Sequence, residues 1–213
     1  GTDIVASNLR VLSQNNIAIN ANGKLALDGS QILGKGNVDL RGQGITTNAA
    51  AVNASQLYLN TGAGNLDNNA GTLYGGNRLQ IDGSNINNKE GYITSGKQLI
   101  VDANHTSLNN ASGTITAPDS ALKNFTTINN HGGTLNVSHD LMLSGSLDNQ
   151  KGKLIAGGNI HVSGAAIDNN AGSISAKNNV DLAADSINSQ GGKIVAGGSL
   201  KMNATDLIVN QAQ

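Results

Sequence analysis

A short internal repeat constrains this chain more than any other feature. Seven similar segments each open on an aliphatic residue and an eighth begins after them, at Leu66, Ile86, Leu108, Ile128, Leu147, Ile167, Ile187 and Leu207. Successive openings lie roughly 20 residues apart, a period within the range of known repeat architectures. Self-similarity at such a period is the signature of a solenoid, in which each unit packs on its neighbours.

Within the seven segments three further positions are nearly invariant. The second residue is Asp or Asn, and an aliphatic residue stands two places after an invariant glycine. The third residue is asparagine in six segments, with Ser189 as the exception: Asn68, Asn88, Asn110, Asn130, Asn149 and Asn169. The sixth is glycine in all seven: Gly71, Gly91, Gly113, Gly133, Gly152, Gly172 and Gly192. Agreement at this level over seven copies excludes a chance match.

The remaining apolar residues follow a strand pattern. Most copies carry two aliphatic residues separated by one position, such as Leu79 and Ile81, and alternation with period two indicates a β-strand. A helix would need apolar residues three and four positions apart over a long stretch, and recurrent glycines interrupt any such run. Each unit therefore has three short extended stretches joined by Gly/Asn turns.

A lone unit of this kind buries too few aliphatic side chains to offset the conformational entropy lost on ordering its backbone. Stacking removes this difficulty, because each unit then forms hydrogen bonds with the units above and below it and its aliphatic side chains form interior columns. We therefore predict an all-β fold, a right-handed parallel β-helix of about ten coils of roughly 20 residues each.

Stacking gives the two invariant polar positions a structural role. It places asparagine over asparagine, and amide side chains can both donate and accept hydrogen bonds along such a column. The glycine suits either a turn with positive φ or a crowded position. We expect both columns to stabilise the stack and assign them no chemistry.

Two parts of the chain depart from the pattern. Residues 1–65 are predicted as about three irregular coils before the regular repeats of 66–213, and residues 46–56 as an outward loop or helical turn; a buried strand of small residues is equally compatible. Residues 117–125 hold the only Pro and the only Phe. One interpretation is a bulge whose Leu122 and Phe125 point inward, and the other is a surface element that forms a recognition patch with His105.

Composition excludes several functions. With a net charge of −1 and 2% aromatic residues, the chain offers neither a basic surface nor stacking platforms for nucleic acid. No apolar run approaches the length of a membrane span, and the absence of cysteine removes thiolate sites and disulfides. The acidic residues are dispersed over turn positions. We predict no catalytic residue, no metal and no cofactor, and so no enzyme activity.

The segments opening at Leu147 and Ile167, with their aliphatic, Asp, Asn and Gly pattern, resemble the filamentous haemagglutinin repeat. The resemblance covers residues 66–213 well and 1–65 loosely. Proteins of that family are very large exoproteins of Gram-negative bacteria, exported through an outer-membrane partner transporter. They serve as adhesins or haemolysins, or present a toxin in contact-dependent growth inhibition.

This resemblance implies a secreted or cell-surface location, two-partner secretion through that transporter, and a receptor on host or bacterial cells. The family's Asn-Pro-Asn secretion motif is missing, since the sole proline is Pro118. We expect an excised stretch of the filament, serving as a non-catalytic shaft. The alternative is that this segment is itself the receptor-binding region, and a polysaccharide-active β-helix enzyme is the third hypothesis.

Overall fold

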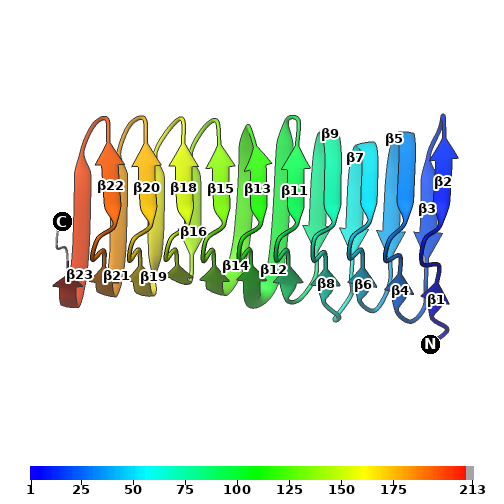
Figure 1. Cartoon of the computed structure of the whole chain (residues 1–213), viewed down its shortest axis with the longest axis horizontal. Coiled ribbons are helices and arrows are strands. Elements are labelled where there is room, and N and C mark those ends of the chain that lie inside the picture. Colours follow the sequence, from blue (N-terminus) through cyan, green and yellow to red (C-terminus); the bar gives the residue numbers. More distant parts are fainter. Residues whose placement is uncertain (210–213) are drawn as a thin grey trace.

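The computed structural model describes residues 1–209, without the side chains of residues 105, 123 and 207–209, and it contains no helix among them. The described residues form one elongated stack of strands, with the first and last strands at opposite ends (Figure 1). The strands are β1 (Ile4–Val5), β2 (Arg10–Ser13), β3 (Ile17–Asn20), β4 (Leu25–Ala26), β5 (Gln31–Arg41), β6 (Ile45–Thr46), β7 (Ala51–Asn60), β8 (Leu66–Asp67), β9 (Thr72–Asp82), β10 (Ile86–Asn87), β11 (Tyr92–Ser95), β12 (Gln98–Asn109), β13 (Thr114–Ala117), β14 (Asp119–Asn129), β15 (Thr134–Val137), β16 (Leu141–Ser144), β17 (Ser146–Asp148), β18 (Lys153–Ala156), β19 (Ile160–Asp168), β20 (Ser173–Ala176), β21 (Val180–Asn188), β22 (Lys193–Ala196) and β23 (Leu200–Val209).

Every pairing between these strands is parallel and joins one coil to the next. Ile86, for example, pairs with Leu66 on one side and with Leu108 on the other. Coils are named below by their opening residues, which are Ile4, Leu25, Ile45, Leu66, Ile86, Leu108, Ile128, Leu147, Ile167 and Ile187. The predicted parallel solenoid of about ten coils is confirmed.

Each coil contributes to three faces of the stack. The opening face consists of residues that align with Leu66–Asp67, the second face of those that align with residues 72–75, and the third face of those that align with residues 78–82. Side chains alternate between the interior and the solvent along the second and third faces, as the pleat of a strand requires. The three extended stretches expected for each unit are these three faces.

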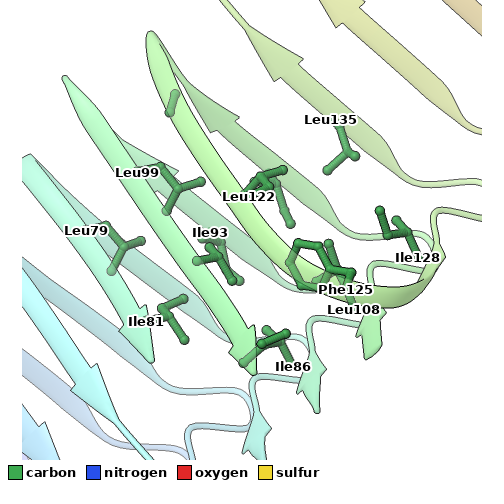
Figure 2. Close-up of a cluster of buried hydrophobic side chains, with 14 of the residues drawn as sticks. Leu79, Ile81, Ile86, Ile93, Leu99, Leu108, Leu122, Phe125, Ile128 and Leu135 are labelled. Atoms are coloured by element: carbon green, nitrogen blue, oxygen red, sulfur yellow. The ribbon is translucent and has the colours of Figure 1, made fainter. Parts of the chain in front are cut away.

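The interior is a continuous column of aliphatic side chains. Leu73, Leu79 and Ile81 are fully buried, and their equivalents in the neighbouring coils lie directly above and below them. Figure 2 shows this packing around the Ile86 and Leu108 coils, where the labelled side chains all point into the space between the strands. The core is therefore continuous along the stack, because the aliphatic side chains of each coil are covered by those of the next coil.

Residues 1–65 continue the same stack in register. Leu25 pairs with Ile4 on one side and with Ile45 on the other, and Ile45 in turn pairs with Leu66. The outward loop predicted for residues 46–56 is wrong, because Ala51–Asn60 is strand β7 and Val52 within it is fully buried. The alternative of a strand of small residues holds for residues 51–56, whereas residues 47–50 form the turn before it and Ala49 there is exposed.

The last coil opens one residue later than predicted. Ile187 pairs with Ile208, whereas the sequence pattern places the opening at Leu207. A register shift between Ala184 and Ser186 accommodates one additional residue in β23.

The third face is interrupted at one place among the described residues. β14 pairs with β12 along Asp119–Lys123, but no residue pairs join this part of β14 to β16 in the next coil. Just before the interruption, the backbone N–H groups of Ser138 and His139 both donate to the carbonyl oxygen of Pro118, each at 3.2 Å. The Ser138 amide also lies 3.3 Å from the carbonyl oxygen of Ala117, so hydrogen bonds are shared at this corner. The opening and second faces remain paired across it.

Candidate functional site

The six asparagines at the third repeat position lie in one buried column beside the opening face, and each is fully buried. In each coil the amide Nδ2 donates to the side-chain oxygen of the next. The N···O distance between consecutive asparagines is 2.8 Å for the first three pairs, from Asn68 as far as Asn130. It is 2.7 Å for the last two pairs, Asn130 to Asn149 and Asn149 to Asn169. Thr47 donates into this column at one end, and Ser189 accepts at the other. The column satisfies buried polar groups at a turn, and it offers no accessible atom to a ligand.

The invariant glycine is required by crowding, and not by its backbone torsion. A Cβ on Gly172 would lie against the backbone oxygen of Asn149 and 2.6 Å from the Oδ1 atom of Asn169. The positive φ falls on the preceding residue in all ten coils: Asn8, Gly29, Ala49, Ala70, Glu90, Ser112, Gly132, Lys151, Ala171 and Gly191. The stack thus imposes the left-handed conformation on several residue types, at a cost of about 1 to 2 kcal/mol for a residue that carries a Cβ and at little cost for the glycines.

Two of the three residues predicted for a recognition patch are buried. Leu122 and Phe125 are 6% and 5% exposed, and Figure 2 shows both pointing into the core. Asn124, between them, has a positive φ, and the strand bulges there so that Leu122 and Phe125 both face inward although they are three positions apart. His105 lies in β12, and its side chain is outside the described residues. The inward interpretation of this segment is therefore the correct one.

A polar cluster that the sequence analysis did not predict lies on the third face of the Leu25, Ile45 and Leu66 coils. Its centre is Tyr58, which pairs with Asp39 in the coil before it and with Gln80 in the coil after it. The guanidinium of Arg41 lies 5.1 Å from the centre of the Tyr58 ring and donates to both oxygens of Asp39 at 2.9 to 3.1 Å. Asn60 donates to the Tyr58 hydroxyl at 3.0 Å. These contacts hold the ring in one orientation.

The same cluster continues into the Leu66 coil. Arg78 donates to Gln80 Oε1 at 2.6 Å, and Gln80 Nε2 donates to Asp82 Oδ2 at 2.8 Å. Partial burial raises the pKa of the Tyr58 phenol above its usual 10.0, and Asp82 adds to the rise because a phenolate beside a carboxylate is disfavoured. The hydrogen bond to Asp39 likewise raises the pKa of Arg41.

A groove runs along one side of Tyr58. It is lined by Asn37, Val38, Asp39, Gln56, Leu57, Tyr58, Arg78 and Gln80. Arg41, Asn60 and Asp82, which contact Tyr58 or its neighbour Gln80, do not line it. The only sequence signal was that Arg41 and Arg78 are two of very few arginines, and no acidic cluster lies beside either of them in the sequence.

The described residues include no group of three His, Cys, Asp or Glu side chains that could hold a metal ion. Two histidines form pairs with aspartates of neighbouring coils: the exposed His139 with Asp119 at 2.6 Å, and the half-buried His161 with Asp181 at 3.3 Å. None of the described residues belongs to a helix long and apolar enough to cross a membrane.

A family model described as haemagglutinin repeat matches the chain three times, over residues 1–70, 56–141 and 119–211. The chain belongs to the haemagglutinin repeat family. No curated protein and no solved structure matches it. The match to the haemagglutinin repeat includes residues 1–65, in agreement with their pairing in register with the later coils.

Proposed function

We propose that this haemagglutinin repeat chain is a non-catalytic shaft segment of a large exoprotein secreted to the surface of a Gram-negative bacterium. The observation that supports this most directly is the unbroken pairing of the opening and second faces from the Ile4 coil to the Ile187 coil. A stack of this kind extends in one dimension and holds whatever follows it at a set distance from whatever precedes it. With about 4.8 Å for each coil, ten coils span about 50 Å.

The partners of such a shaft follow from the family. An outer-membrane two-partner-secretion transporter would export the chain, and the complete exoprotein would act in adhesion or present a toxin for contact-dependent growth inhibition. The stack suits export in an extended state, because each coil forms its contacts with the coil before it and the chain has no cysteine that must be oxidised.

The test is an in-register deletion in the full-length exoprotein. Removal of residues 86–186 joins Asn85 to Ile187, which opens a coil as Ile86 does. We expect the filament to shorten by about 24 Å, five coils at about 4.8 Å each, when it is measured by electron microscopy. Attachment to target cells should be retained. A matched deletion of residues 86–176 ends half a coil out of register and should disrupt the filament. Loss of attachment in the in-register variant, with the filament intact, would overturn the passive role.

The second candidate function is that this segment itself binds the receptor. The two stretches that depart from the repeat, residues 46–56 and the flank around Leu122, do not supply its basis, because Val52, Leu122 and Phe125 within them are buried. One specific observation still favours it, namely the pre-ordered groove beside Tyr58, since a spacer alone needs no such arrangement.

A further inference from the structure

We propose that the groove beside Tyr58 binds a sugar residue that carries a carboxylate, such as a uronic acid or a sialic acid. This inference goes beyond the shaft role and does not depend on it. It rests on three features of the groove: an aromatic wall that is already immobilised, amide groups at the spacing of adjacent coils, and a guanidinium without an acidic partner.

The aromatic wall is Tyr58. Arg41 lies over the ring at 5.1 Å and Asn60 holds its hydroxyl, so little side-chain entropy remains to be lost when a ligand contacts the groove side. A flat aromatic ring presents apolar surface to the C–H groups on one face of a pyranose. Within the described residues Tyr58 is the only aromatic side chain on the third face apart from the inward Phe125, because Tyr74 and Tyr92 belong to the second face.

The amide groups come from three successive coils. Asn37 and Gln56 pair with each other across the Leu25 and Ile45 coils, and Gln80 follows in the Leu66 coil. Each amide carries both donors and an acceptor. A sugar hydroxyl also donates and accepts, so a row of amides beside an aromatic ring matches the alternation of hydroxyls and C–H faces around a pyranose.

The charge of the groove selects the class of sugar. The carboxylate of Asp39 is held by Arg41 in a bidentate ion pair, with its oxygen 2.9 Å from the Arg41 Nη2 atom. Arg78 forms no ion pair among the described residues, and its one described side-chain hydrogen bond goes to a neutral amide. Its remaining N–H donors are arranged in the fork that binds a carboxylate with two hydrogen bonds.

The surroundings argue against a more highly charged ligand. Asp39 and Arg78 are the only charged residues that line the groove, and Asp39 is paired with Arg41, so a polyphosphate or nucleic acid would meet a single available cation. A ligand with one carboxylate and no other charge matches the groove better, because its carboxylate can pair with the guanidinium of Arg78.

The experiment is calorimetric titration of the full chain with trigalacturonic acid and with 3′-sialyllactose, and with maltotriose and lactose as neutral counterparts. We expect saturable binding of at least one acidic probe, and the acidic probe that binds identifies which source of the carboxylate the groove accepts. The neutral counterpart should bind about tenfold more weakly or not at all, since a hydrogen bond to a charged group contributes about 1.5 to 3 kcal/mol.

Substitutions locate the site. Arg78→Gln should weaken binding of the acidic probe about tenfold without changing the neutral one. Tyr58→Ala should abolish both, and Tyr58→Leu provides a second variant that keeps an apolar side chain on the strand. The matched control is Lys201→Gln, which removes one positive charge from an exposed position of the third face in the Ile187 coil, six coils from Arg78. Circular dichroism of each variant shows whether the β-helix is still folded.

Three results would overturn the proposal: no saturable binding of either acidic probe, equal affinity for acidic and neutral probes, or binding that Arg78→Gln and Tyr58→Ala leave unchanged. None of them would bear on the shaft role, because the length of the filament and its response to the in-register deletion do not involve this groove.

Discussion

The coils from Leu147 to Ile187 and the coils from Ile86 to Ile128 follow the same repeat but differ on one face. In the first group Ile160, Val180 and Leu200 pair directly with one another, and the third face is continuous. In the second group the strands bulge at Asn104 and Asn124, and the third face is unpaired between β14 and β16. The opening face is paired throughout both groups.

The asparagine column shows which part of the coil tolerates change. Its N···O distance is 2.8 Å from Asn110 to Asn130, beside the interruption, and 2.7 Å from Asn149 to Asn169, in the regular coils. The turn at the column is thus constant, whereas the register shifts between coils fall at the corners on either side of the third face. The Tyr58 groove also lies on the third face. The turn at the asparagine column is thus the constant side of each coil, and the third face is the side that varies between coils.

The largest effect is expected where the constant turn is crowded. Gly133→Ala should destabilise the chain by about 3 kcal/mol, because the new Cβ would meet the backbone oxygen of Asn110. Its neighbour Gly132 has a positive φ of 62° and only the Ser112 Oγ atom within 4 Å of an added Cβ. Gly132→Ala should therefore cost only about 1 kcal/mol. Urea unfolding followed by circular dichroism measures both, and equal losses would remove the distinction between crowding and backbone torsion.

The interruption itself should be visible in amide hydrogen exchange. The inward residues of the third face donate to the next coil, as the bond from Ile160 N to Asn179 O at 2.9 Å shows. Ser120 and Leu122 face the unpaired side of β14, so their amides should exchange about 100-fold faster than those of Ile160 and Val162, equivalent to about 2.7 kcal/mol. Similar protection in the two groups of coils would mean that the third face is paired in solution.

The asparagine column tests whether the two groups of coils share one scaffold. Asn110→Ala and Asn149→Ala should each cost about 2 kcal/mol, since each leaves buried polar atoms in the adjacent coils without a partner. Gln150→Ala, on the same turn but with its side chain outside the column, is the control and should be nearly neutral. A loss at Asn110 much smaller than at Asn149 in thermal unfolding would show that the interruption weakens the column as well.

The smallest expected effect is a gain in stability. Ser120 pairs with Leu99 in the register of an aliphatic column, and its Oγ atom is buried without a hydrogen-bond partner. Ser120→Ala removes that hydroxyl and should stabilise the chain by about 1 kcal/mol. Ser144→Ala, at an exposed position of the next coil, serves as the reference. Differential scanning calorimetry distinguishes the two, and a lower transition temperature for Ser120→Ala would indicate that its hydroxyl has a structural role.

The sequence pattern was sufficient wherever the motif is complete. Spacing and alternation identify the strands from Leu66 onward and bring the asparagines together in one column. The earlier coils were predicted less well because Leu27 and Thr47 stand at the asparagine position, while Ser30 and Ala50 stand at the glycine position. Thr47 still donates to Asn68, and small residues still fit the crowded turn. The turn therefore keeps its geometry in these coils although the residues at the asparagine and glycine positions differ.

The sequence by itself determined that this chain stacks, because a motif that recurs at a regular interval with alternating aliphatic residues can bury those residues only against its own copies. The tertiary structure decided which side chains meet on the outside. Asp39, Tyr58 and Arg78 belong to three successive coils and share no local motif, and they come together only because the register places them on one face. The inward direction of Leu122 and Phe125 was decided in the same way, because several asparagines could adopt a positive φ and only the register places the bulge at Asn124.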